Sequence, residues 1–158
     1  MNPLAVCAFV ALTFWVGGLT LFDAVVIPAL FRALPREEAG RTAGLLFPAV
    51  ERWISVWALV ACVALLFFFR DRHWEVRSLV LELPVAVMAA FTLYSAWILQ
   101  PEIQEVRGRM QQPEFQGTTH LEKLRFSFDW FHRLSVRLHG IILFLGWLTL
   151  TLLPRFLR

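Results

Sequence analysis

The chain has 158 residues, of which 58% are apolar and only 17% are charged, and its mean hydropathy is +0.62. A soluble protein of this length exposes too much surface to hide so many apolar side chains, so the composition excludes an ordinary soluble enzyme, a disulfide scaffold and a disordered tail. The net charge of +3 comes from arginines at the ends of apolar runs, which is typical of membrane spans and not of a nucleic-acid surface. The composition therefore predicts a small integral membrane protein whose partner is the lipid bilayer.

Four apolar runs have the length of a membrane-crossing helix, which takes roughly 20 residues. They are continuous rather than alternating, which argues against strands. The runs cover residues 4–31, 53–69, 79–99 and 134–153. We expect an all-α, polytopic integral membrane protein. Its single membrane domain, residues 1–158, would be an antiparallel bundle of four transmembrane helices with both termini on one face.

The connections between these runs differ in kind. Residues 70–78 form a tight, charged turn, whereas residues 32–52 and 100–133 are longer and define what we call the long-loop face. The first long connection contains four helix breakers, which predict short helical pieces rather than one rod. These breakers are Pro35, Gly40, Gly44 and Pro48.

The second long connection carries helical signals. Apolar residues recur at spacings of three and four on both sides of the Gln112-Pro113 turn, and Thr119 with Glu122 has the spacing of a capping box. Spans three and four are therefore expected to extend beyond the membrane as a helical hairpin.

The orientation follows from the basic residues. Nine Lys and Arg residues lie on the long-loop face and five on the opposite face, so the count predicts cytoplasmic long loops and external termini. The short turn packs three arginines into few residues, and this density favours the reverse orientation. We follow the count.

Ionisable side chains inside the apolar runs are the candidate functional residues, because a charge in hydrocarbon must be paired, line water or serve a function. Asp23 and Arg137 lie at similar depths below the long-loop face, so we expect them to pair. His132, Ser135 and His139 share one face of the fourth span and are expected to join this polar cluster.

Several roles stay open for the cluster. The first is a structural pair that fixes helix packing, the second a relay for protons or ions, and the third a metal site formed by His132, His139 and Asp23. Alternatively, Arg137 extends to the membrane interface and does not pair with Asp23. Both histidines rise from the same helix face about 10 Å apart, so they cannot be the two axial ligands of one haem. Pro28 is expected to kink span one just past Asp23. Glu82, near the short-turn end of span three, is a separate intramembrane charge.

Four short segments resemble the transmembrane protein 205 family, whose bacterial relatives are catalogued as a membrane domain of unknown function. They are Phe31-Arg32-Ala33-Leu34-Pro35, Leu46-Phe47-Pro48, Gln100-Pro101 and Phe131-His132-Arg133-Leu134-Ser135. The resemblance covers nearly the whole chain. It implies a four-span fold and a membrane location, here the bacterial cytoplasmic (inner) membrane, but no established reaction. The chain departs from that family at His139, where the family typically has Asn.

Two classes of function compete. The first is a non-enzymatic accessory or scaffold subunit, or a small binding or transport module, without cofactor or catalytic residues. The second is a redox or metal- or haem-binding protein, because the architecture is distantly similar to copper-resistance D and membrane protoporphyrinogen oxidase. We favour the first, since the sequence has no nucleotide or phosphate motif, no complete metal motif, and no nucleophile with a base at defined spacing. Small residues along span one favour helix contacts, so a homo-oligomer or a subunit of a larger complex is expected.

Overall fold

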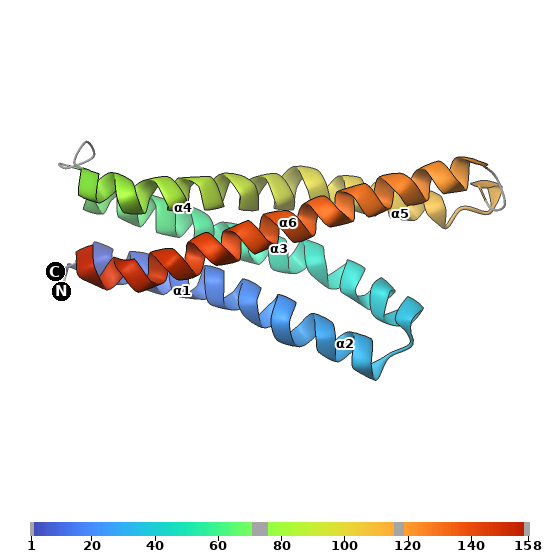
Figure 1. Cartoon of the computed structure of the whole chain (residues 1–158), viewed down its shortest axis with the longest axis horizontal. Coiled ribbons are helices and arrows are strands. Elements are labelled where there is room, and N and C mark those ends of the chain that lie inside the picture. The colour runs from blue at the N-terminus through green and yellow to red at the C-terminus, as the bar shows by residue number, and fades with distance from the viewer. Residues whose placement is uncertain (1, 71–75, 116–118, 157–158) are drawn as a thin grey trace.

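The computed structural model describes residues 2–70, 76–115 and 119–156, and within them it has four long helices packed antiparallel (Figure 1). The first span consists of α1 (Pro3–Leu21), a π-helical turn η1 (Phe22–Val26) and α2 (Ile27–Ala33). The second is α3 (Arg36–Phe68), which follows a short turn at Leu34 and Pro35. Together they form what we call the first hairpin.

The second hairpin repeats this plan. Its first arm consists of α4 (Val76–Tyr94), a π-helical turn η2 (Ser95–Leu99) and α5 (Gln100–Met110). A 3-10 turn, η3 (Pro113–Phe115), precedes the second arm, α6 (Thr119–Phe156). The predicted fold class is confirmed, including the extension of spans three and four as a helical hairpin that turns near Gln112. Both termini lie at the same end of the bundle (Figure 1).

Each hairpin has its π-helical turn at the same place in its first arm. In both arms a 19-residue helix leads into the turn. The second residue after the turn is a proline in each arm, Pro28 in the first hairpin and Pro101 in the second. A proline cannot donate to the carbonyl four residues earlier and crowds it, and a wider turn relieves that conflict. The distortion expected near Pro28 therefore takes the form of a π-helical turn around Asp23 itself.

The interpretation of residues 32–52 as short helical pieces is wrong. They belong to α2 and to α3, which continues through Pro48. The carbonyl of Gly44, to which Pro48 has no N–H to donate, accepts a hydrogen bond from Nε2 of Gln104 in α5 at 2.8 Å, and Gly44 lets Arg107 of that helix approach. Tertiary contacts thus outweigh the low helix propensity of these residues.

The main hydrophobic core lies in the half of the bundle that holds the termini. Trp15, Leu12 and Met88 are fully buried there, and the indole N–H of Trp15 donates to Oγ1 of Thr92 at 3.2 Å. Gly146 of α6 sits so close to α1 and α4 that an added Cβ would lie 2.5 Å from Cγ2 of Val16. The two hairpins are therefore tightly joined in this half.

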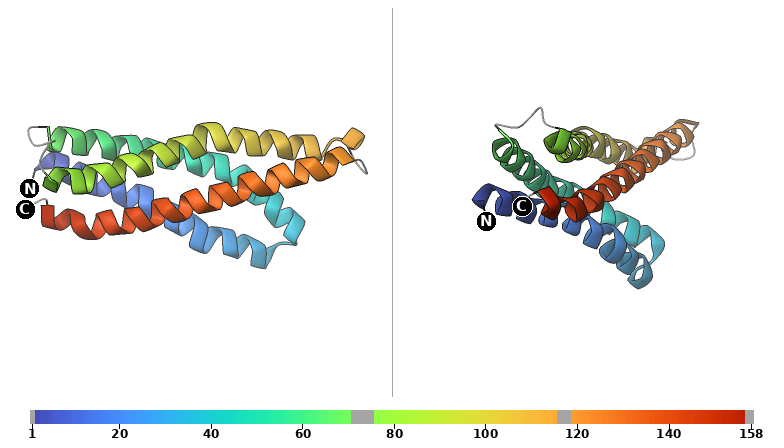
Figure 2. Two further views of the ribbon diagram at one scale, coloured as in Figure 1. Left: turned by 45° about the horizontal axis from the view of Figure 1, so that its top comes forward. Right: turned by 60° about the vertical axis from the view of Figure 1, so that its left-hand side comes forward.

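Toward the long-loop face the hairpins diverge. Figures 1 and 2 show α2 and the start of α3 leaving the axis of the bundle, while α5 and α6 stay together on the other side. A smaller apolar cluster around Leu99, Ile103 and Leu138 holds α5 against α6. The separation of the hairpins makes room for the site described below.

The outer surface is apolar. Large hydrophobic side chains point outward from all four long helices, among them Leu21, Leu66, Leu83 and Phe144. Each long helix also contains a stretch long and apolar enough to cross a bilayer. The chain is thus an integral membrane protein with four candidate spans.

Candidate functional site

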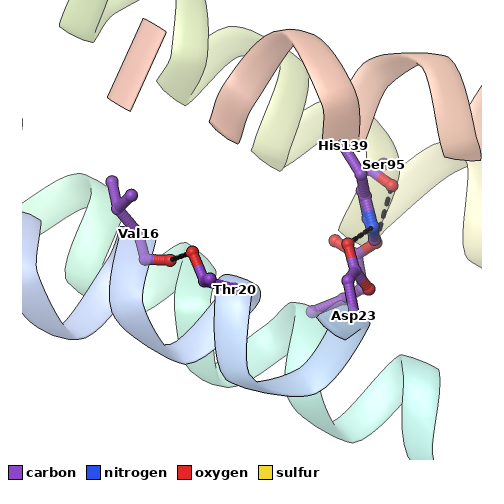
Figure 3. Close-up of polar contacts among 6 residues, drawn as sticks. Val16, Thr20, Asp23, Ser95 and His139 are labelled. Carbon is purple, nitrogen blue, oxygen red and sulfur yellow. Dashed lines mark hydrogen bonds and ion pairs between the residues drawn. The ribbon is translucent and has the colours of Figure 1, made fainter. Parts of the chain in front are cut away.

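A buried polar cluster joins the two hairpins where they begin to diverge. His139 of α6 lies between two carboxylates of the first hairpin: its Nδ1 is 3.0 Å from Oδ2 of Asp23, and its Nε2 is 2.6 Å from Oε1 of Glu51. Oγ of Ser95 donates to the same Oε1 at 2.8 Å. Figure 3 shows His139 reaching from α6 toward Asp23, with Ser95 beside it. We call these four residues the His139 cluster.

π-Helical backbone positions two of the four members. Asp23 lies in η1 and Ser95 in η2, while Glu51 and His139 lie in the regular helices α3 and α6. One turn before Asp23, Oγ1 of Thr20 donates to the carbonyl of Val16 at 2.7 Å (Figure 3). π-Helical turns often occur at functional sites because they re-aim side chains without ending the helix.

The cluster contains more acceptors than donors. If both nitrogens of His139 carry hydrogens, the imidazolium donates to both carboxylates and neutralises one of their two charges. Oε2 of Glu51, whose side chain is 1% exposed, still has no hydrogen-bond partner. Such orphaned buried atoms are rare in native proteins. Oε2 of Glu51 is therefore an unused hydrogen-bond acceptor inside the cluster.

His139 has no ring nitrogen left for a metal, because a carboxylate occupies each of them. Within the described residues, no three His, Cys, Asp or Glu side chains are grouped so that they could hold a metal ion. His132 stands apart from the cluster: it is exposed, and its ring stacks parallel to that of Phe128 with 6.1 Å between centroids. The structure thus does not bring together His132, His139 and Asp23.

The expected pairing of Asp23 with Arg137 is corrected to a pairing with His139. Arg137 is exposed on α6, two residues before His139. Two residues correspond to a rotation of about 200° around a helix axis, so the two side chains point in nearly opposite directions. Arg137 and His139 therefore lie on different faces of α6, and His139 is the one that contacts Asp23.

A cavity of about 630 Å³ extends from the cluster toward the long-loop face, between the diverging hairpins. Asp23, Ser135 and His139 lie at its deep end, and apolar side chains from α2, α3 and α6 form much of its wall. Those apolar residues include Ile27, Phe31, Phe47, Val136 and Leu143. Gly140 also lines it, and an added Cβ there would meet no atom within 4 Å.

Glu82 lies elsewhere, as expected. It lines a small pocket of about 230 Å³ together with Cys62 and Val85, between α3 and α4. It is half-buried, and it takes no part in the His139 cluster.

The comparisons with known proteins give one match. The model of the family described as "Domain of unknown function (DUF4149)" matches residues 10–112. The chain belongs to this family. Asp23, Glu51 and Ser95 fall inside the part that matches DUF4149, and His139 falls outside it. No curated protein and no solved structure matches the chain.

Sequence reasoning missed Glu51 and Ser95 in this DUF4149 protein. Glu51 was assigned to a connection, although a seven-residue repeat of buried positions runs straight through it. That repeat consists of Gly44, Glu51, Ala58 and Leu65. The repeat could have revealed both the longer helix and the inward direction of Glu51. Ser95 carried no comparable signal, because a single serine in an apolar span usually bonds to its own backbone.

Proposed function

We propose that this DUF4149 protein is a non-enzymatic binding module of the membrane, which holds a small, largely apolar molecule between its two hairpins. The observation that carries the proposal is the cavity of about 630 Å³ that ends at the His139 cluster. Ligand sites in proteins measure roughly 300–1,000 Å³ and combine apolar walls with a few polar groups. The cavity has both properties.

The position of the cavity also supports a binding role. Phe31 and Val136 line it and are also exposed, at 45% and 58%, so the apolar wall continues onto the lipid-facing surface. A molecule dissolved in the bilayer thus has an apolar route into the cavity. Asp23 has one carboxylate oxygen outside its contact with His139 and offers the ligand a hydrogen-bond acceptor at the deep end.

The alternative redox or metal function needs ligands that are free to bind. His139 is engaged on both nitrogens, and Asp23 on one oxygen. A metal at this place would have to displace contacts that join the hairpins. The binding role needs no such displacement, and we therefore prefer it.

Further expectations belong to this proposal. We propose a relationship to the transmembrane protein 205 family, and a location in the bacterial cytoplasmic membrane with the long-loop face inside. The exposed apolar side chains on all four helices also suit contact with a second copy or another membrane chain.

Photolabelling tests the binding role. The protein in phosphatidylcholine vesicles is irradiated with photoactivatable hexadecanol, and the labelled peptides are mapped by mass spectrometry. We expect saturable labelling of the cavity residues of α2 and α6. Gly140→Phe should abolish it, because the new side chain projects from a cavity-lining position with open space around its Cβ.

Gly17→Phe is the matched control. Gly17 also has open space around it and lies in a helix, but it does not line the cavity. Its labelling pattern should equal that of the wild type. Labelling of α2 and α6 that is unaffected by Gly140→Phe would overturn the proposal.

A further inference from the structure

The end of the cavity nearest the long-loop face is basic. Arg36, Arg107 and His132 line it, whereas Asp23, the acidic residue among its lining residues, lies at the other end and is paired with His139. In the described part of the chain, neither arginine forms an ion pair with a carboxylate. We call these three residues the basic mouth.

Arg107 is held in place by the helices around it. Its guanidinium lies 5.5 Å from the centre of the Phe128 ring, whose parallel neighbour is His132. It also lies against α3, where a Cβ on Gly44 would come within 1.2 Å of Nη1. Nε2 of Gln104 donates to the Gly44 carbonyl at 2.8 Å and fixes α5 on α3 at this point. The guanidinium is thus positioned without a carboxylate partner, which leaves its donors available to a ligand.

The basic mouth and the His139 cluster lie at opposite ends of an apolar chamber. Phe128 and His139 are eleven residues apart on α6, which corresponds to about 16 Å along the helix. Between them the wall is formed by side chains such as Ile27, Phe47 and Val136. The chamber is therefore shaped for an elongated molecule with a charged end.

Resting on the binding role proposed above, we infer that the ligand is a single-chain amphiphile with an anionic head group, a carboxylate or a phosphate. The head group binds at the basic mouth, where the arginines donate charge-assisted hydrogen bonds. The acyl chain lies in the apolar chamber and enters through the lipid-exposed side that Phe31 and Val136 line. Guanidinium groups suit both carboxylate and phosphate, so the mouth accepts either head group.

Paired photoactivatable probes test the charge requirement. Palmitic acid and a lysophosphatidic acid carry the anionic head groups, and hexadecanol supplies the same chain without charge. In vesicles of zwitterionic phosphatidylcholine, we expect both anions to label the cavity more strongly than the alcohol. The double variant Arg36→Gln with Arg107→Gln should lower labelling by the anions about tenfold or more and leave labelling by the alcohol unchanged.

Arg109→Gln is the matched control. Arg109 is an exposed arginine on the same helix, it pairs with Glu105, and it does not line the cavity. Its labelling by all three probes should equal that of the wild type. A general effect of surface charge on anion uptake by the vesicles would instead appear in this variant as well.

The outcomes separate the two proposals. In one outcome, acid and alcohol label the cavity equally, Gly140→Phe blocks the labelling, and the double variant Arg36→Gln with Arg107→Gln does not change it. This outcome would overturn the inference about the head group and leave the binding role standing. Labelling that Gly140→Phe does not block for any probe would overturn both. Stronger labelling by one anion than the other, with the arginine dependence intact, supports the inference and identifies the head group.

Discussion

At the residue scale, His139 makes two of the polar contacts between the hairpins, one with each arm of the first hairpin. Asp23 and Glu51 belong to the first hairpin, and His139 and Ser95 to the second. Three contacts of the cluster cross between the hairpins: Asp23 with His139, Glu51 with His139, and Glu51 with Ser95. A single imidazole thus ties together three of the four spans.

His139→Ala should therefore strongly destabilise the bundle. It leaves two carboxylates in the interior without their shared donor, and removal of one partner from a buried ionic group costs about 3–5 kcal/mol. His132→Ala is the control, because His132 is exposed and lies outside the cluster; its cost should be about 0.5 kcal/mol. Unfolding free energies in mixed detergent micelles measure both. Equal losses in the two variants would contradict the role given to His139.

At the element scale, Gly146 and Gly140 lie on the same helix but meet different surroundings. A Cβ at Gly146 would approach Val16 to 2.5 Å and Met88 to 3.1 Å, whereas Gly140 faces open space. Gly146→Leu should cost about 1–3 kcal/mol through overpacking of α6 against α1 and α4. Gly140→Leu should be neutral or slightly stabilising, since it replaces a glycine inside a helix. The same unfolding measurement distinguishes them, and similar values would show that the hairpins are not in close contact at Gly146.

The number and direction of the helices follow from the sequence, because apolar runs that exceed the bilayer thickness leave few alternatives. The long α3 does not follow as easily: Gly40, Gly44 and Pro48 look like helix breakers in the sequence, and the close approach of Arg107 from α5 to Gly44 is known only from the structure. The partner of Asp23 was not predicted. Arg137 and His139 are two residues apart on α6, which corresponds to a rotation of about 200°, and His139 is the one that meets Asp23.

The His139 cluster, too, was predicted only in part. Sequence reasoning identified Asp23 and His139 as polar residues in apolar spans, since the cost of charge in hydrocarbon marks them out. It chose Arg137 as the partner because opposite charges at one depth are the simplest pair. Glu51 was not predicted as a partner, because it was assigned to the connection 32–52, where a carboxylate is expected to be exposed to solvent.

At the scale of the whole molecule, the two halves of the bundle differ in how tightly they are packed. The half that holds the termini is closed by a packed core, and the other half is open, with the cavity between the hairpins. The His139 cluster lies at the boundary between them. The deep end of the cavity therefore lies next to the contacts that join the two hairpins. A molecule bound there would contact both hairpins at once.

The most direct test of the account is an isotope-filtered NOE experiment on the labelled protein with unlabelled palmitic acid in deuterated micelles. If the acyl chain lies between the hairpins, NOEs connect it to methyl groups of Ile27, Val136 and Leu143, which line the cavity, and these NOEs are lost in Gly140→Phe. NOEs only to outward-facing methyl groups such as those of Leu59 and Leu66, unchanged in that variant, would contradict binding between the hairpins.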